Sequence, residues 1–309
     1  MKPIRVWWAG YVTEAHHYPW QGAALIAALA ELEGIQCVFD PGEVEDCRLL
    51  VCASSIKNHW HTTRKLRAVY GLPTVHYCWD IYPWQVAGGD PPTQERAEYW
   101  AEYLDELRTA KEIWIPSPSV ASRVAEFVGA NPTKVIETSV RTYRGVEPWD
   151  GGYVLDPLRS YPDPNRLIVP KACEELGLPC IRTDNAMPRD EFERTVAGAR
   201  LIVSAPVEAS TGGLTLLEGY ALGKPVLLCD SPRNGAGHYF GSRAAYFRAD
   251  DRDDLKMRLR ALYDSSDPKD KDPKWLDVQR FTQHRWVCGS FAESVMARKI
   301  ANRVRALCE

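Results

Sequence analysis

The sequence predicts an α/β protein of two doubly wound domains that face each other across a cleft. Three observations lead to this prediction. Short apolar runs alternate with helical patterns along most of the 309 residues, which is typical of parallel β-α-β units. A segment without periodicity, rich in glycine and proline, interrupts the alternation at residues 141–152. The chain is also longer than the roughly 100–200 residues of one domain.

The first domain is expected at residues 1–145. Short apolar runs predict its strands, which are Ile4–Ala9, Gln36–Phe39, Leu49–Ala53, Thr74–Cys78, Glu112–Ile115 and Val135–Glu137. Apolar residues that recur every three or four positions predict the intervening helices, which are Gln21–Leu32, His61–Val69, Gln94–Ala110 and 117–129. Gly34 is expected to end the first of these helices, and Thr93 to cap the third.

The second domain is expected at residues 146–280. Its predicted strands are Tyr153–Leu155, Cys180–Arg182, Leu201–Ser204, Lys224–Cys229 and Ala244–Phe247. Its predicted helices are Pro164–Leu176, Arg189–Ala197, Leu214–Leu222 and Asp253–Tyr263. The pattern over Trp275–Leu307 is also helical, and residues 281–309 are expected to pack back across both domains. Ligands of such open sheets bind outside the carboxyl ends of the strands.

Composition excludes several classes of protein. Apolar residues make up 45% and charged residues 26%, and the formal net charge of −3 argues against bulk electrostatic binding to nucleic acid or anionic membrane. The nine cysteines are scattered without a C-x-x-C pair, which favours small buried hydrophobes in a reducing cytoplasm over a zinc site. The sequence shows neither a signal peptide nor an apolar run long enough to span a membrane, so a cytoplasmic location is expected.

The most informative segment is Ser204–Asp230. Gly212 and Gly213 have no Cβ atoms, so the backbone can approach a ligand closely. The free N–H groups at the start of the helix predicted from Leu214 carry partial positive charge, and together these features favour a diphosphate. Glu218, one turn further on, is suited to accept hydrogen bonds from ribose hydroxyls. A glycine pair alone is also common in structural βα turns, and the dinucleotide pattern G-x-G-x-x-G is absent.

The same segment carries a resemblance to a known family. Gly212-Gly213-Leu214 is followed by Leu217-Glu218-Gly219-Tyr220-Ala221-Leu222-Gly223-Lys224-Pro225-Val226. This resembles the C-terminal signature of retaining glycosyltransferases (family 4-like, group 1) of the GT-B fold, which has two Rossmann-like domains. The family's Gly-x-Gly-Leu and Leu-Glu-Ala-x-Ala-x-Gly-x-Pro-Val are spaced identically. The resemblance covers Ser204–Tyr263 well and Tyr153–Ala199 loosely, whereas the N-terminal half matches only in its βα rhythm.

The resemblance implies transfer of a sugar from a nucleoside-diphosphate sugar, with UDP-sugar favoured, to an acceptor hydroxyl with retention of configuration. It implies no cofactor besides this co-substrate, and no catalytic metal is expected. The donor-binding residues it implies are Arg159, Lys171, Asn185, Met187, Ser210, Thr211, Gly212, Gly213, Leu214, Thr215 and Glu218. The main chain of residues 212–215 would hold the diphosphate, and the backbone around 185–187 would flank the nucleobase.

The chain departs from the family at two places. The family has a second glutamate eight positions before the one that matches Glu218, where this sequence has Ser210, so Glu208 is the candidate replacement. The family also has an arginine and a lysine five residues apart after the first strand of this domain. Arg159 fits the first position, but the second is Pro164, so Lys171 or Arg166 is the candidate second cation.

The N-terminal half supplies the remaining candidates, which follow its predicted strands. The run His76–Trp84 resembles the family's His-Asp at the cleft, with Trp79 where histidine is usual, and Asp80 is suited to bind the sugar or the acceptor. A neutral His16 imidazole is suited to act as a base toward an acceptor hydroxyl. The predicted catalytic residues are therefore Asp80, Glu208 and His16, and the predicted acceptor-side residues are Gly10, Tyr11, His17, His76 and Trp79.

Several alternatives stay open at this point. The acceptor is a saccharide, a lipid-linked sugar, a small metabolite or a hydroxylated pyrimidine in DNA. Basic residues between Lys57 and Arg67 surround Trp60, which is suited to stack on a nucleic-acid acceptor, although a solvated helix face explains the same pattern. A nucleotide-sugar epimerase, with Glu208 and His238 as its acid/base pair, and a non-catalytic nucleotide-sugar binding protein are the competing functions.

Overall fold

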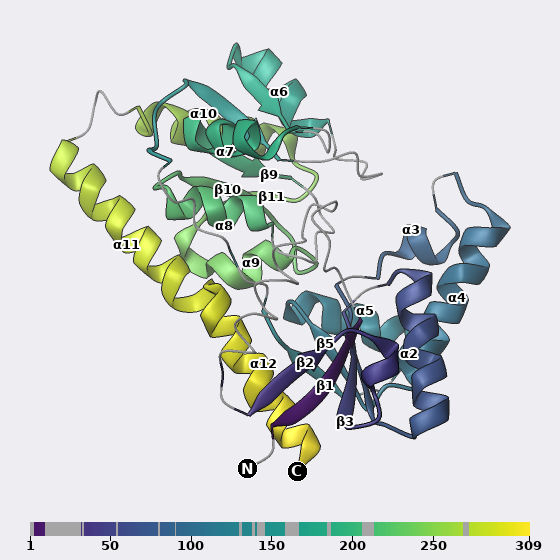
Figure 1. Cartoon of the computed structure of the whole chain (residues 1–309). Coiled ribbons are helices and arrows are strands. Elements are labelled where there is room, and N and C mark those ends of the chain that lie inside the picture. Colours follow the sequence, from purple (N-terminus) through teal and green to yellow (C-terminus); the bar gives the residue numbers. More distant parts are fainter. Residues whose placement is uncertain are drawn as a thin grey trace. The chain divides into compact units, whose positions relative to one another are not determined.

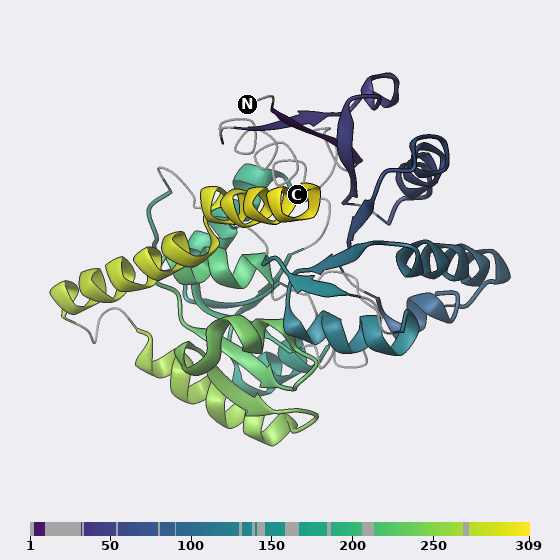
Figure 2. The ribbon, with the colours of Figure 1, turned by 90° about the horizontal axis from the view of Figure 1, so that it is seen from below.

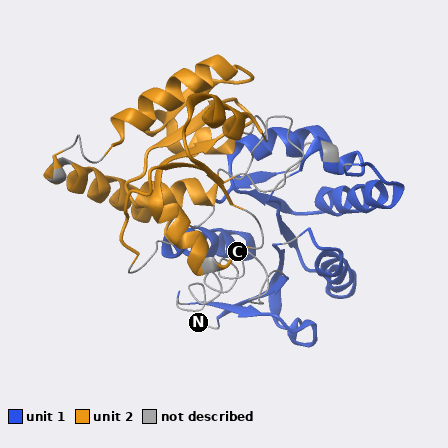
Figure 3. Cartoon of the chain, turned by 90° about the horizontal axis from the view of Figure 1, so that it is seen from above, with its two compact units in different colours: residues 1–139, 293–309 blue, residues 140–292 orange. Residues whose placement is uncertain are grey.

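The chain forms two compact units, which Figure 3 colours separately. Unit 1 comprises residues 1–139 and 293–309, and unit 2 comprises residues 140–292. The boundary expected after residue 145 lies a few residues beyond this division, and the segment 281–309 is shared between the units. The computed structural model describes residues 3–9, 32, 34–53, 55–79, 81–89, 91–129, 132–137, 140, 146–157, 167–183, 187–205, 213–267 and 272–309.

Unit 1 is built on a parallel sheet. Among the described residues it has six strands in the order β2-β1-β3-β4-β5-β6. Each neighbouring pair runs parallel, as in the pairing of Val6 with Cys37 on one side and Leu49 on the other. The strands are β1 (Ile4–Ala9), β2 (Ile35–Val38), β3 (Cys47–Cys52), β4 (Thr74–Tyr77), β5 (Glu112–Ile115) and β6 (Thr133–Val135).

Side chains alternate between the two faces of this sheet, because successive residues of a strand point in opposite directions. On one face Trp7, Leu50 and Ile113 belong to a core that includes residues of α2, α4 and α5. The helices α2 and α4 lie side by side (Figure 2). The described helices of this unit that precede its last strand are α2 (Lys57–Tyr70), α3 (Pro83–Val86), α4 (Gln94–Arg108) and α5 (Pro118–Phe127), with a short 3-10 turn, η1, at Pro41–Glu43.

The opposite face of the unit 1 sheet is covered by the end of the chain. Helix α12 (Glu293–Cys308) buries an apolar stripe, of which Ile300 and Val304 are fully enclosed, against Trp8 and Trp114. Figure 1 shows this yellow helix against the purple N-terminal strands. Full burial of one large aliphatic side chain contributes about 1.5–3 kcal/mol, so this stripe is a substantial part of the unit 1 core.

Unit 2 has a second parallel sheet. Among the described residues it has five strands in the order β11-β10-β9-β7-β8. The strands are β7 (Tyr153–Asp156), β8 (Cys180–Arg182), β9 (Ala199–Ser204), β10 (Val226–Asp230) and β11 (Ala245–Arg248). The helices of this unit are α6 (Ile168–Leu176), α7 (Arg189–Gly198), α8 (Leu214–Ala221), α9 (Gly235–Phe240), α10 (Arg252–Ser265) and α11 (Pro273–Phe291), with the 3-10 turn η2 at Gly241–Arg243.

Helices cover both faces of the unit 2 sheet. Residues of α7, α8, α9 and α11 share one core with Leu155, Ile202 and Leu228. Residues of α6 and α10 share the other core with Val154 and Val203. Both sheets are therefore parallel with helices on both faces, which is the doubly wound arrangement that the βα alternation predicts.

Most predicted elements are present, and the differences among the described residues concern a break in the last predicted helix, two short helices and the last strand of unit 1. The helix predicted over Trp275–Leu307 is broken at Ala292, whose φ of −60° and ψ of 149° are extended. Before this break, Phe291 packs in the unit 2 core that includes α8, and after it Met296 packs in the unit 1 core that includes α12. The short helices α3 and α9 fall in segments for which the sequence predicted no helix, and β6 begins at Thr133 rather than at Val135. The helix predicted at Gln21–Leu32 lies outside the described residues, apart from Leu32.

Candidate functional site

The order of strands in unit 2 contains a switch point. Strands β7 and β9 are neighbours, although the chain passes from β7 through α6 and β8 before it reaches β9. Connections therefore leave this pair in opposite directions, and ligands of open α/β sheets bind at the carboxyl ends of such strands. Here β7 ends at Asp156 and β9 ends at Ser204.

Helix α8 follows β9 and begins beside this switch point. Gly213 is its N-cap and has φ 61° and ψ 88°, a left-handed conformation that favours glycine. A Cβ atom on Gly213 would lie 2.7 Å from Leu216 Cδ1. Leu216 and Leu217 donate their N–H groups to the Gly213 carbonyl. The N–H groups of Leu214 and Thr215, in the first turn, therefore have no acceptor within the helix. This end of α8 has the local structure expected of an anion site.

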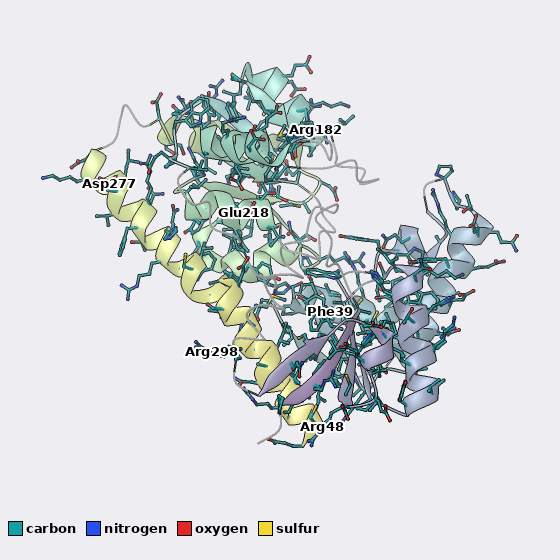
Figure 4. The ribbon with its side chains drawn as sticks, viewed as in Figure 1. Phe39, Arg48, Arg182, Glu218, Asp277 and Arg298 are labelled. Carbon is teal, nitrogen blue, oxygen red and sulfur yellow. The ribbon has the colours of Figure 1, made fainter. Side chains whose placement is uncertain are left out.

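Glu218 lies one turn into α8 and is 3% exposed. Figure 4 labels it on this helix. The next residue is glycine because α8 lies directly on β9: a Cβ atom on Gly219 would collide with Ile202. Helix α8 is thereby held close to the sheet, and Glu218 takes its position from that packing.

Two polar residues that the sequence reasoning did not select face each other at the ends of β7 and β8. Asp156 and Arg182 are register partners, and Arg182 Nε donates to Asp156 Oδ2 at 3.1 Å. The Asp156 side chain is completely buried, whereas that of Arg182 is 34% exposed. Figure 4 labels Arg182 at this edge. The signal that was available is a charged residue at the end of each short strand, at the edge where ligands bind.

The described candidates from the donor list are distributed over both faces of unit 2. Met187 is half-buried and packs against the core that includes Leu216, so it shares a face with α8. Lys171 is exposed on α6, whose buried residues Ala172 and Cys173 belong to the core of the opposite face. The other predicted residues lie outside the described part of the chain: Gly10, Tyr11, His16, His17, Asp80, Arg159, Asn185, Glu208, Ser210, Thr211 and Gly212.

Trp79 lies just beyond the carboxyl end of β4 in unit 1. Its indole Nε1 donates to the carbonyl of Ala53 at 3.0 Å, and its ring lies 4.5 Å from that of Tyr77 between centroids. Tyr77 is fixed in turn, because its hydroxyl donates to the Ile136 carbonyl at 2.6 Å. The half-buried Trp79 side chain is therefore held by β3, β4 and the segment after β6.

His76 does not have the location that an acceptor-side residue needs. It is completely buried, with its Nε2 3.4 Å from Glu106 Oε1 under α2 and α4. Glu106 also pairs with Arg64 at 3.0 Å and with Arg67 at 2.6 Å. The prediction that His76 contacts an acceptor is wrong, because the alternation of β4 turns its imidazole into the core under α2 and α4.

Burial by itself lowers the pKa of His76, but the hydrogen bonds and charges of Cys52 and Glu106 outweigh it and raise the pKa to about 9. Burial likewise raises the pKa of Glu106, but hydrogen bonds from His76, Arg67 and Arg64 outweigh it and lower the pKa to about 2. The pair is charged at neutral pH and ties β4 to α4.

The basic face of α2 is also not an aromatic binding platform. Trp60 is completely buried, and the guanidinium of Arg64 lies 5.0 Å from its ring centroid. Lys57 and His61 pair with Glu102 of α4, at 3.4 Å and 3.5 Å. The interpretation in which Trp60 stacks on a nucleic-acid acceptor is therefore wrong, because the ring belongs to the core of unit 1.

Within the described ranges, no group of three or more His, Cys, Asp or Glu side chains is placed to hold a metal ion. Asp251 and Asp253 form an Asp-x-Asp pattern, but both side chains interact with the first turn of helix α10. Asp251 Oδ1 accepts from the Asp254 N–H at 2.9 Å, and Asp253 pairs with Lys256 at 2.7 Å. Among these residues there is also no helix with the length and apolar character needed to cross a membrane.

Solved structures share this fold. The glycosyltransferase from Rickettsia africae ESF-5 has a TM-score of 0.66 at 11% identity, with 100% of both chains covered. The sucrose-phosphate synthase from Thermosynechococcus elongatus has a TM-score of 0.64 at 13% identity, with 99% of both chains covered. Anabaena HepE in complex with UDP-glucose has a TM-score of 0.68 at 10% identity, with 98% of this chain and 100% of that chain covered.

The fold is that of GT-B glycosyltransferases. This confirms the predicted fold class, an α/β protein of two Rossmann-like parallel-sheet domains. At these identities the likeness concerns the fold alone. Neither a protein-family model nor a curated protein sequence matches the chain.

Proposed function

We propose that this protein is a glycosyltransferase that binds a nucleoside-diphosphate sugar on unit 2 and transfers the sugar to a hydroxyl of an acceptor held by unit 1. A UDP-sugar is the favoured donor. HepE has the same fold and its structure contains UDP-glucose. Free thiols at all nine cysteines are consistent with work in a reducing cytoplasm.

One observation carries the proposal. Helix α8 begins next to the switch point of the unit 2 sheet, behind a glycine in a left-handed conformation. The N–H groups of Leu214 and Thr215 and the helix dipole are suited to bind the donor diphosphate. Gly212, Thr211 and Ser210, which precede this turn, would complete the cradle, and Glu218 would hold the ribose.

The transfer chemistry follows from the same end of the helix. As the bond from the sugar to the diphosphate breaks, negative charge develops on the leaving group, and fixed N–H donors stabilise it. Arg159 and Lys171 are the proposed additional cations, and no step in this proposal uses a metal ion. Attack by the acceptor hydroxyl on the face from which the diphosphate leaves would retain the configuration of the sugar, with Asp80, Glu208 and His16 as the candidate groups around the reacting carbon.

The test is a thermal-shift screen of UDP, GDP, ADP and UDP-glucose. A ligand at 100 times its dissociation constant should stabilise the protein by roughly 2.7 kcal/mol. The Glu218→Gln variant should lose the response to UDP and keep the response to inorganic pyrophosphate, because the ribose contact is removed and the α8 cradle is not. No response of the wild type to any nucleotide or to pyrophosphate would remove the proposal.

A turnover assay separates the proposed transferase from an epimerase. With UDP-glucose and a panel of saccharide and metabolite acceptors, a transferase releases UDP in proportion to the acceptor consumed. An epimerase changes the sugar of the donor without releasing UDP. Isomerised UDP-sugar with no UDP would therefore contradict the transferase.

A further inference from the structure

Two cysteine thiols of unit 2 are in direct contact. Cys173 lies on α6 and belongs to the core on that side of the sheet, and Cys180 begins β8 and packs against the same core. The Cys173 thiol donates a hydrogen bond to the sulfur of Cys180. Both are free thiols in the structure. Two cysteines can be joined by a disulfide only when their side chains converge, and this contact meets that condition.

The backbone between the two cysteines is held on both sides of a tight turn. Helix α6 ends at Gly177, whose φ of 64° is left-handed, and the Cys173 carbonyl accepts the N–H of Leu178 at 2.9 Å. The carbonyl of Pro179 accepts the N–H of Val154 at 2.9 Å, which holds the start of β8 against β7. The convergence of the two thiols is therefore a property of the α6–β8 turn.

The two thiols differ in their access to solvent. Cys173 is completely buried, whereas Cys180 is half-buried. Strand β8 is the edge strand of the unit 2 sheet among the described residues, and the next side chain along it, Ile181, is 36% exposed. A small reagent from solvent therefore reaches Cys180 first.

The contact also makes the two thiols unequal in acidity. The hydrogen bond from Cys173 lowers the pKa of the Cys180 thiol and outweighs burial, which raises it. The charge of Asp156 raises the pKa of Cys180, and that of Arg182 lowers it. The same hydrogen bond, together with burial, raises the pKa of Cys173. An accessible thiol that ionises readily, next to a second thiol, is the arrangement of redox-sensing cysteines.

We propose that Cys173 and Cys180 are a redox-active pair, in which Cys180 reacts with a low-molecular-weight disulfide such as oxidised glutathione and Cys173 completes a reversible intramolecular disulfide. This modification site is independent of sugar transfer and goes beyond the proposed function. It is compatible with a reducing compartment, where disulfides are transient and serve catalysis or redox sensing.

The oxidation takes two thiol–disulfide exchange steps. The Cys180 thiolate attacks one sulfur of the small disulfide, whose S–S bond breaks, and one small thiolate leaves. Cys173 gives up its proton and attacks the Cys180 sulfur, so the mixed disulfide breaks and the second small thiolate leaves. Two protein thiols are oxidised, one small disulfide is reduced, and the two small thiolates take up the two protons.

The test uses the full chain in glutathione buffers with an increasing share of the oxidised form. Remaining thiols are alkylated in denaturant, and the peptides are identified by mass spectrometry. The expected product is a disulfide between Cys173 and Cys180, which dithiothreitol reverses. If both cysteines are still alkylated after incubation with oxidised glutathione alone, the proposal is overturned. This measurement on the wild type stays decisive even if a variant fails to fold.

Two variants test the assigned roles. In Cys173→Ala, Cys180 should accumulate as a stable mixed disulfide with glutathione, because the thiol that resolves it is absent. In Cys180→Ala, Cys173 should stay unmodified, because it is buried. Glutathione on Cys173 in the Cys180→Ala variant would overturn the assigned order of attack, and a wild type that stops at glutathione on Cys180 would overturn the role of Cys173.

Cys288→Ala is the matched control. This variant removes the other half-buried thiol of unit 2, which lies on α11 with its Sγ 3.3 Å from His284 Nε2. The disulfide between Cys173 and Cys180 should form in it to the same extent as in the wild type. Loss of that disulfide in the control would show that oxidation passes through Cys288 and would overturn the assignment to Cys180.

Discussion

The guanidinium of Arg303, on the last helix of the chain, holds the buried carboxylate of Glu112 on β5, with Nε 2.9 Å from Oε1 and 2.8 Å from Oε2. The two residues are 191 positions apart. Glu112 also accepts a hydrogen bond from the indole of Trp114 at 3.2 Å. This ion pair and the apolar stripe of α12 fasten the end of the chain to the N-terminal sheet.

Replacement of Arg303 by methionine is expected to destabilise unit 1 by about 3 kcal/mol, because Glu112 would be left buried without its cationic partner. This loss of stability can be measured by chemical denaturation, with hydrogen exchange of the unit 1 amides as the probe. Lys299→Met is the matched control on the same helix. Its partner Glu137 is about one-third exposed, so the cost should stay below about 1 kcal/mol. Equal effects of the two variants would contradict the assigned role of Glu112.

The pair of His76 and Glu106 predicts a loss of unit 1 stability at high pH. The pKa of folded His76 is raised to about 9, whereas the unfolded value is near 6.5. The stabilisation is therefore fully present below about pH 6.5 and is lost as the pH rises through about 9. The protection of the β4 amides from hydrogen exchange should fall between about pH 6.5 and pH 9. In the His76→Gln variant this dependence of protection on pH should disappear.

Lys224 of unit 2 supplies an internal control with the opposite sign. Burial, together with the Arg280 charge, lowers its pKa to about 8, and its Nζ donates to the Trp149 carbonyl at 2.7 Å. The unfolded chain therefore binds more protons than the folded chain between about pH 8 and pH 10.4, and unit 2 gains stability as the pH rises through this range. If the β10 amides and the β4 amides both lose protection from hydrogen exchange as the pH rises, neither Lys224 nor His76 governs the pH dependence of stability.

A Gly213→Ala substitution is expected to abolish UDP binding and to destabilise unit 2. A residue with a Cβ in the left-handed region costs about 1–2 kcal/mol, and the added methyl group would also press on Leu216. Gly177 separates the backbone strain from the loss of UDP binding. Its φ of 64° is similar, but no atom lies within 4 Å of where an added Cβ would be. Gly177→Ala should lose comparable backbone stability and retain the thermal shift with UDP.

Trp79→Phe should weaken the acceptor and spare the donor. The phenyl ring keeps an aromatic surface but loses the hydrogen bond to Ala53 that fixes the indole. The expected result is a severalfold rise in KM for the acceptor, with an unchanged dissociation constant for UDP measured by calorimetry. The control is Trp286→Phe, because that indole packs in unit 2 against Tyr220 and Phe240. A lower affinity of the Trp79→Phe variant for UDP would contradict the assignment of Trp79 to the acceptor side.

The local structure of the proposed donor site was largely accessible from sequence. Gly213, the start of α8 and the position of Glu218 one turn later all depend on local spacing, which the sequence displays directly. The pairing of Asp156 with Arg182 was missed, because a charged residue at the end of a short strand is common, and only the register of β7 against β8 shows that the two meet. His76 was misplaced because a polar side chain in a strand is compatible with either face until the covering helices are known.

Local patterns in the sequence determined the βα alternation, the interruption of that alternation at residues 141–152, and Gly177 as the end of α6, because dihedral preferences and apolar periodicity act over a few residues. The tertiary structure decided the strand order, the assignment of α12 to the N-terminal sheet, and the partners of buried charges such as Glu112 and Glu106. Those features depend on contacts between residues that are tens to hundreds of positions apart in the sequence. The energy of such a contact arises only when the two elements pack together, so a short stretch of sequence does not contain it.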